Sequence, residues 1–288
     1  MHLTPGDSDY VLVREPVPET TVPVVFDSPH SGRRFPPDFA PAVPLEDLVG
    51  YEDRFVDDLV ASAPAHGIVL VAADFPRAYI DPNRAEDDLD AHVVEDGWHS
   101  ALNPTPYGER GIGLVFRKLQ SGKAIYDHPL SHAELDRRIE GYWRPFHARL
   151  EAALDAAVQR WGVVWHVDWH SMRPMGDALS PDPGEIRPDF VVSDRDGTTA
   201  DAAFTDRVRE ILSDLGHSVA INAPFKGGYV VQRAGRPDAG RHSLQVEINR
   251  ALYLDPETLQ RGPGFEALRS DLDRAMAAIA DYAREAAA

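Results

Sequence analysis

The sequence predicts an α/β fold, a three-layer sandwich in which one mostly parallel, mixed sheet is flanked by helices. Short apolar runs of strand length alternate with segments of helical spacing along most of the chain. Neither an internal repeat nor a low-complexity linker interrupts this alternation. A chain of 288 residues is long enough for one large α/β domain. We therefore predict a single domain over residues 1–288, with the C-terminal helix packed on it.

The expected elements follow from the spacing of the apolar residues. Residues 1–20 and 85–130 are predicted to be mainly irregular, with one hairpin near residues 113–118. A capping box at residues 131–134 begins a long helix that Pro145 should kink. The other predicted helices cover residues 45–65, 200–215 and 265–284. The predicted strands are 22–27, 68–72, a central strand from residue 163, 190–193, 219–221 and 244–248.

Composition excludes several classes of protein. The 29 basic and 47 acidic residues give a net charge of −18, which argues against nonspecific binding to nucleic acid or to an anionic membrane. Because there is no cysteine, a metal site must use His, Asp and Glu. No apolar run approaches the ~18 residues of a transmembrane helix, and the N-terminus shows no signal-peptide pattern. We expect a cytoplasmic enzyme.

The end of the central strand carries the motif Asp-x-His-Ser, residues 168–171. Ligands of open α/β sheets bind beyond the carboxyl ends of the strands, so His170 is a candidate metal ligand. Asp168 would hold the imidazole ring or lie beside the site. His166 is on the same face and is either a fallback ligand or a residue that supports a ligand. The alternative interpretation is that His170 only caps the next turn.

Two further candidates for a metal site come earlier in the chain. His30 follows the first predicted strand in Pro-His-Ser-Gly, where Gly32 would let the backbone pass close to another segment. This motif also fits an ordinary strand-ending turn. Asp53 precedes the apolar residue Phe55 on the predicted helix, and it points either toward the sheet or to solvent.

Arginines and a glutamate suggest how a substrate is bound and attacked. Arg77, Asn83 and Arg84 follow a buried strand, and paired arginines in an acidic protein suggest a small acidic substrate. They also fit a surface Arg–Asp pair. Strand alternation places Gln245 and Glu247 on the face opposite the neighbouring apolar residues. Glu247 is then either a paired structural acid or a catalytic base.

Five motifs occur in order between about residues 22 and 255. They are Ser-Pro-His-Ser-Gly, Arg-x-x-x-Asp-x-Asn-Arg, Asp-x-His-Ser-Met, Asn-x-Pro-Phe-Lys-Gly-Gly and Leu-Gln-Val-Glu-Ile-Asn-Arg-x-Leu-Tyr. With these motifs the chain resembles the N-formylglutamate amidohydrolase family. This family is similar in fold to zinc carboxypeptidases and aspartoacylase. The resemblance implies one zinc ion per chain and hydrolysis of the amide bond of an N-acyl amino acid without a covalent intermediate.

Carried over to this sequence, the resemblance implies zinc ligation by His30, His170 and an acid near Asp53. Carboxypeptidases often have a glutamate three residues after the first histidine, but here that position is Arg33. We therefore choose Asp53, in preference to Glu52, as the third ligand.

The resemblance also assigns the remaining roles. Glu247 would be the general base, and Arg77 would help to stabilise the oxyanion. The substrate-binding residues would be Arg84, Asn83, Lys226, Gly227 and Gly228. The expected reaction converts N-formyl-L-glutamate into glutamate and formate, a step of histidine degradation. The alternatives are a related zinc deacylase or carboxypeptidase acting on another N-acyl amino acid or small peptide, and a non-catalytic protein that binds an acidic metabolite.

Overall fold

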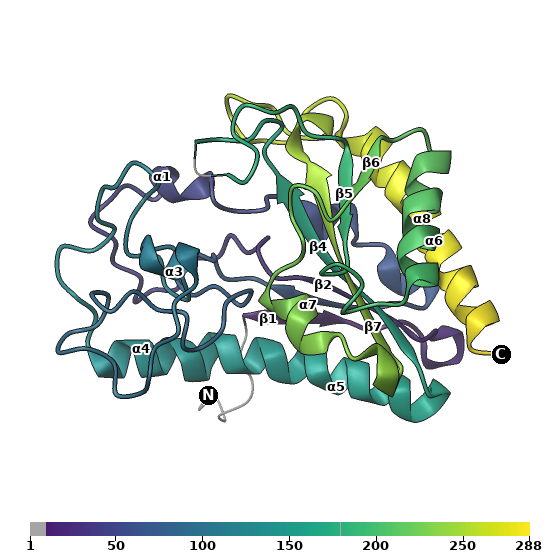
Figure 1. Cartoon of the computed structure of the whole chain (residues 1–288), viewed down its shortest axis with the longest axis horizontal. Helices are drawn as coiled ribbons and strands as arrows, with labels where there is room; N and C mark the ends of the chain where they lie inside the picture. The colour runs from purple at the N-terminus through teal and green to yellow at the C-terminus, as the bar shows by residue number, and fades with distance from the viewer. Residues whose placement is uncertain (1–9, 179) are drawn as a thin grey trace. The chain divides into compact units, whose positions relative to one another are not determined.

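The computed structural model describes residues 10–178 and 180–288. Seven strands form one sheet in the order β1-β3-β2-β4-β7-β5-β6 (Figure 1). β2, β4 and β7 are mutually parallel, and β5 is parallel to β6 but antiparallel to β7. The predicted mixed sheet flanked by helices is therefore confirmed. The strands are β1 Val11–Arg14, β2 Val24–Ser28, β3 Val69–Ala73, β4 Val164–Met172, β5 Phe190–Ser193, β6 Val219–Ile221 and β7 Arg241–Asn249.

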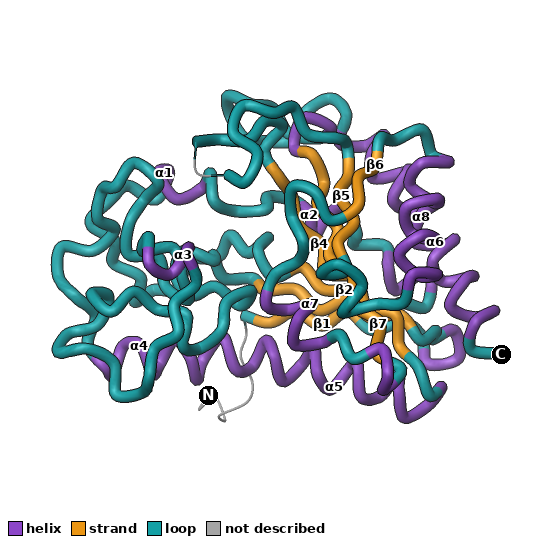
Figure 2. Tube along the Cα trace, viewed as in Figure 1, coloured by secondary structure: helices purple, strands orange, loops and turns teal. Residues whose placement is uncertain are grey.

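The chain divides into two compact units. One contains Pro29–Glu52 and Ala72–Arg149 together with the described residues up to Leu12, and the other contains Val13–Ser28, Asp53–Val71 and Leu150–Ala288. Loops and turns make up most of residues 72–130 in the first unit (Figure 2). In place of the hairpin predicted near residues 113–118, this segment has isolated antiparallel bridges between Ile112 and Phe116 and between Lys118 and Ala124.

The hydrophobic core of the second unit lies on one face of its strands. Alternate residues of β2, β4, β5 and β7 point into this core, among them Phe26, Trp169 and Val246. Helices α2 (Val56–Leu59), α6 (Ala202–Asp214) and α8 (Phe265–Ala286) supply the apolar side chains that cover it. Because strand residues alternate between faces, the other residues of β4 and β7 form a face that is largely polar and also buried.

The later helices begin and end close to their predicted positions. The carboxylate of Asp201 caps α6 by accepting a hydrogen bond of 2.8 Å from the Phe204 backbone N–H. The capping box of Ser131 and Glu134 is present and begins α4 (His132–Arg138). A π-helical segment, Ile139–Trp143, joins α4 to α5 (Arg144–Trp161), and it ends two residues before Pro145. A wider turn suits this position because proline cannot donate the usual helical hydrogen bond.

The prediction of one helix over residues 45–65 is wrong. The structure has only α1 (Glu46–Val49), α2 and a 3₁₀ turn at Ala63–His66. Phe55 adopts a left-handed conformation with φ of 63°, which separates the short helices. Contacts that Asp53 makes with the end of β4 compete with helical propensity here.

The structure also contains elements that were not predicted. β1 lies in the lead-in that was expected to be irregular, and α3 (Pro106–Glu109) and α7 (Tyr229–Ala234) are short helices. Across the described ranges, no helix combines the length and apolarity that crossing a membrane requires. The single-domain interpretation stays a prediction.

Candidate metal centre and active site

His170 lies near the carboxyl end of β4 on the polar face of the sheet, and it is 2% exposed. Its Nε2 is 2.8 Å from Oδ1 of Asp168, and its Nδ1 is 3.0 Å from Oδ2 of Asp53. Burial alone would lower the pKa of His170, but Asp168, with help from Asp53 and Glu247, raises that pKa well above its usual range. The ring is therefore held between carboxylates, a surrounding that also attracts a metal cation.

His30 comes two residues after β2, and a carboxylate also holds its ring. Nε2 of His30 is 2.7 Å from Oδ1 of Asp81, which accepts a second hydrogen bond from the Asn83 backbone N–H. The other oxygen of Asp81 accepts hydrogen bonds from Nε and Nη2 of Arg77 at 3.0 and 2.7 Å. Burial raises the pKa of Asp81, but Arg77 and His30 outweigh it and hold that pKa well below its usual range. Asp81 is thus ionised, and its carboxylate holds the His30 ring in place through Nε2.

Gly32 explains how the loop after β2 reaches its place. A Cβ atom at this residue would lie 2.2 Å from the carbonyl oxygen and 2.4 Å from the nitrogen of Phe75. The expected close approach of the backbone at Gly32 is therefore confirmed, because no larger residue fits there without a shift of the chain.

Asp53 is 2% exposed, and its two carboxylate oxygens have different partners. Oδ2 faces Nδ1 of His170. Oδ1 accepts hydrogen bonds from Oγ of Ser171 and from Nη2 of Arg250, each at 3.0 Å. Nε of Arg250 donates to Oγ of Ser171 at 3.0 Å, so the Ser171 hydroxyl hydrogen is left for Asp53. With Oδ1 held by Ser171 and Arg250, Oδ2 is the oxygen that faces the candidate ligand His170.

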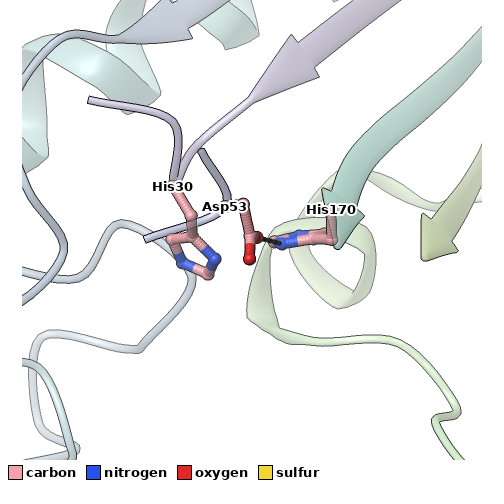
Figure 3. A group of neighbouring side chains, drawn as sticks. All are labelled: His30, Asp53 and His170. Carbon is pink, nitrogen blue, oxygen red and sulfur yellow. Dashed lines mark hydrogen bonds and ion pairs between the residues drawn. The ribbon is translucent and has the colours of Figure 1, made fainter. Parts of the chain in front are cut away.

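His30, Asp53 and His170 together form a possible metal-binding group. The ligand atoms that they offer lie within 4.8 Å of one another, and all three residues are buried (Figure 3). Two imidazoles and one carboxylate are a ligand set that suits zinc and leaves a position open for a further ligand. Each imidazole contacts a carboxylate through Nε2, an arrangement typical of metal-binding histidines. The donor set therefore fits one divalent transition-metal ion.

Glu247 lies on β7 directly beside His170 of β4 in the parallel register. It is buried on the polar face of the sheet, where Nε2 of Gln245 donates a hydrogen bond of 2.9 Å to its Oε1. Neighbouring positions on parallel strands with side chains on one face are close in space. A carboxylate so near a candidate metal ligand is well placed to accept a proton from water.

The other predicted residues have defined surroundings. Nη1 of Arg84 donates to the carbonyl oxygen of Asn83 at 3.0 Å, and the Arg84 guanidinium lies over the Tyr107 ring. Lys226 is exposed and forms an ion pair of 2.8 Å with Asp196. The substrate-binding roles of these side chains, and the role of Arg77 at the oxyanion, stay predictions.

The two residues considered as alternative metal ligands, His166 and Glu52, lie outside the metal-binding group. His166 contacts Asp27 and Ser243, each at 2.7 Å, and is not one of the three grouped residues. Glu52 is buried but is likewise outside that group, which contains Asp53.

Sequence reasoning gave no role to four residues around the site. Asp81, Ser171, Gln245 and Arg250 hold the candidate ligands or the candidate base. Their only signal was position, because each lies inside a recognised motif within about three residues of one that was singled out.

A family model described as N-formylglutamate amidohydrolase matches residues 22–254. The chain belongs to this family. It is therefore a hydrolase that acts on an amide. The N-formylglutamate deformylase of Pseudomonas putida is 26% identical over 239 residues, which cover 81% of this chain and 82% of that protein. The corresponding protein of Pseudomonas aeruginosa is 25% identical over 270 residues, covering 92% and 95%.

Solved structures agree with this family membership. The N-formylglutamate amidohydrolase of Ralstonia eutropha JMP134 is 40% identical, with a TM-score of 0.90 and coverage of 96% of this chain and 99% of that chain. A gene product of Agrobacterium tumefaciens is 17% identical, with a TM-score of 0.65 and coverage of 95% of each chain. At this lower identity the similarity shows the fold alone.

Proposed function

We propose that this amide hydrolase removes the formyl group of N-formyl-L-glutamate with the help of one zinc ion, releasing formate and glutamate. The observation that carries the proposal is the grouping of His30, Asp53 and His170, with Glu247 in register beside His170. The names of the relatives, N-formylglutamate deformylase and amidohydrolase, support the choice of substrate.

In this proposal His30, Asp53 and His170 hold the zinc ion. When bound, the ion supplies Lewis-acid chemistry, which polarises an amide carbonyl and makes a water more acidic. Asp81 and Asp168 keep the two imidazoles oriented through their Nε2 atoms. Arg250 and Ser171 keep one oxygen of Asp53 occupied, so that its other oxygen is presented to the ion.

Glu247 acts as the general base. Its carboxylate takes a proton from the attacking water and later delivers it to the amine nitrogen as the C–N bond breaks. Arg84 and Asn83 bind a carboxylate of the amino acid. Arg77 helps to stabilise the oxyanion, and residues 226–228 contact the substrate. These assignments rest on the family motifs and on the charge of the side chains.

The activity test compares substrates and measures metal content. Chelator-treated protein should be inactive with N-formyl-L-glutamate and should regain activity with about one equivalent of zinc. Preference for N-acetyl-L-glutamate or a small peptide would instead favour the related deacylase or carboxypeptidase. Binding of the acidic amino acid without turnover of any acyl derivative would favour a non-catalytic binding protein.

The ligand and base assignments have separate tests. Asp53→Ala should weaken zinc binding strongly, whereas Glu52→Ala should not. Glu247→Gln should keep zinc bound while kcat falls by about 10² to 10⁴, the usual contribution of general acid–base catalysis. A folded, zinc-loaded Glu247→Gln protein with the parent's kcat would place the base elsewhere.

A further inference from the structure

Gln245 lies beside Glu247 on the polar face of β7. The two residues are two positions apart in the strand, so their side chains project from the same face. Nε2 of Gln245 donates a hydrogen bond of 2.9 Å to Oε1 of Glu247. Gln245 is only 4% exposed, so water competes little for this hydrogen bond.

The orientation of the Gln245 amide is determined by a second contact. The backbone N–H of Gly228 donates a hydrogen bond of 2.7 Å to Oε1 of Gln245. A backbone N–H can only donate, so the amide oxygen must face Gly228 and the NH₂ group must face Glu247. The donor toward Glu247 is therefore fixed by the backbone of the loop.

The loop that provides this N–H group is itself held in place. Nη1 of Arg195 donates to the carbonyl oxygen of Gly227 at 2.9 Å, and the Arg195 backbone N–H donates to that of Lys226 at 2.9 Å. Gly227 has a φ of +104°, and a Cβ atom there would lie 2.7 Å from Cγ2 of Val231. The anchor of Gln245 thus has little freedom to move.

We infer that Gln245 is a positioning residue that holds the carboxylate of Glu247 in the orientation needed for proton transfer. This inference rests on the proposed role of Glu247 as the base. The hydrogen bond from Gln245 fixes the position of Oε1 and so restricts rotation of the Glu247 carboxylate. Proton transfer is sensitive to orientation, since the base must be within hydrogen-bond reach of the proton that it takes.

The main test replaces Gln245 with methionine, which has nearly the same shape but cannot donate a hydrogen bond. Gln245→Met should lower kcat by about 10- to 100-fold, the range expected for losing a hydrogen bond to a charged group. KM for N-formyl-L-glutamate and the zinc content should stay within about twofold of the parent, because neither substrate nor metal contacts are removed. An unchanged kcat, or an effect on KM alone, would overturn the inference.

A matched control is available on the same strand and face. Asn249 is another buried amide, but its Nδ2 donates to the backbone oxygens of Arg187 and Pro188, and its Oδ1 accepts from the Ala251 backbone N–H. Asn249→Leu removes a buried amide without touching the contact between Gln245 and Glu247. Measured at saturating zinc, it should leave kcat of the folded protein near the parental value, because the turn at Arg250 that Asn249 caps is expected to affect zinc affinity. An equal fall of kcat in both variants would mean that the effect is only structural.

Two more variants make the test decisive. Gln245→Glu keeps an acceptor for the Gly228 N–H but replaces the amide donor with a second carboxyl group. Two adjacent buried carboxyl groups share one proton, so Glu247 becomes a poorer base and kcat should also fall at least tenfold, even if Gln245→Met fails to fold. In a Glu247→Gln background, adding Gln245→Met should change kcat by less than about twofold, because the two residues act as one unit. Additive effects would contradict the inference. A fully active Glu247→Gln protein would instead refute the proposed base.

Discussion

At the scale of single residues, buried charge decides how the candidate site is built. Two buried carboxylates at the site have hydrogen-bond donors of their own: Asp81 has Arg77, and Asp53 has Arg250 and Ser171. A buried ion without such partners would be costly. These partners therefore hold each carboxylate in a fixed orientation beside the candidate ligands.

Arg250 gives a direct prediction about metal affinity. Arg250→Met should weaken zinc binding by about 10- to 100-fold, the usual effect of removing a group that orients a ligand. The reason is that Oδ1 of Asp53 would lose the hydrogen bond from Nη2 of Arg250. Competition with a zinc-binding dye measures the affinity. Arg274→Met, which changes an arginine on the exposed side of α8, is the control and should have no effect. Tighter zinc binding by Arg250→Met would show that repulsion between two cations, and not orientation, dominates.

Asp27 gives a prediction about pH and stability. Burial, together with the Asp168 carboxylate, raises the pKa of Asp27 to about 7, although His166 opposes this. In metal-free protein between pH 4 and 7, the folded state therefore keeps a proton that the unfolded state releases. The contribution of Asp27 to the free energy of unfolding should fall as pH rises through this window.

The neutral variant Asp27→Asn should lack this dependence. Relative to the parent, its free energy of unfolding should increase between pH 4 and 7, with an upper limit of about 4 kcal/mol for a pKa raised from 3.8 to about 7. Urea denaturation at several pH values measures the difference. Ser213→Ala, an exposed change near the end of α6 that removes no titratable group, should give a difference that does not vary with pH. The same flat profile for Asp27→Asn would contradict the assignment.

At the scale of elements, the loops after the strands need particular backbone geometry. The segment after β2 passes so close to Phe75 that only glycine fits at Gly32, and this close passage positions His30 two residues earlier. The segment before β4, by contrast, is an ordinary capped helix whose distortion lies next to Pro145. The backbone therefore tolerates least change at Gly32, where the chain leaves the sheet after β2.

Gly32→Ala tests this requirement. The new Cβ would overlap backbone atoms of Phe75, so the free energy of unfolding should fall by about 1 to 3 kcal/mol, and zinc affinity should fall because His30 is displaced. Urea denaturation and zinc titration measure both effects. Gly50→Ala is the control: its Cβ has nothing within 4 Å, so it should be neutral or slightly stabilising. Parental stability and zinc affinity in Gly32→Ala would contradict the expected clash.

At the scale of the whole molecule, the parallel sheet brings together residues that are far apart in the chain. β4 and β7 are separated by about seventy residues, yet their register places His170 beside Glu247. Residues 30, 53 and 170 of the metal-binding group are likewise distant in sequence. A ligand that binds such a group only in the folded state stabilises the whole fold.

Zinc should therefore raise the stability of the protein in a concentration-dependent way. At free zinc a hundredfold above the dissociation constant, the gain should be about 2.7 kcal/mol. Thermal unfolding with and without zinc measures it. His170→Ala should lose the gain, whereas His217→Ala, outside the group, should keep it. A zinc-dependent gain of the same size in His170→Ala would mean that the ion binds at another place.

The sequence by itself determined the order of most strands and the later helices, because apolar spacing and caps are local properties. It also singled out His30, His170 and Glu247, because polar residues in or just after strands stand out within apolar runs, whereas the choice of Asp53 came from the family resemblance. Tertiary structure decided what those side chains contact. Local spacing predicted a helix over residues 45–65, but the contacts of Asp53 with Ser171 and Arg250 depend on a break there. Tertiary structure also decided the roles of Asp81, Gln245 and Arg250, because hydrogen bonds between distant segments leave no periodic signal in a sequence.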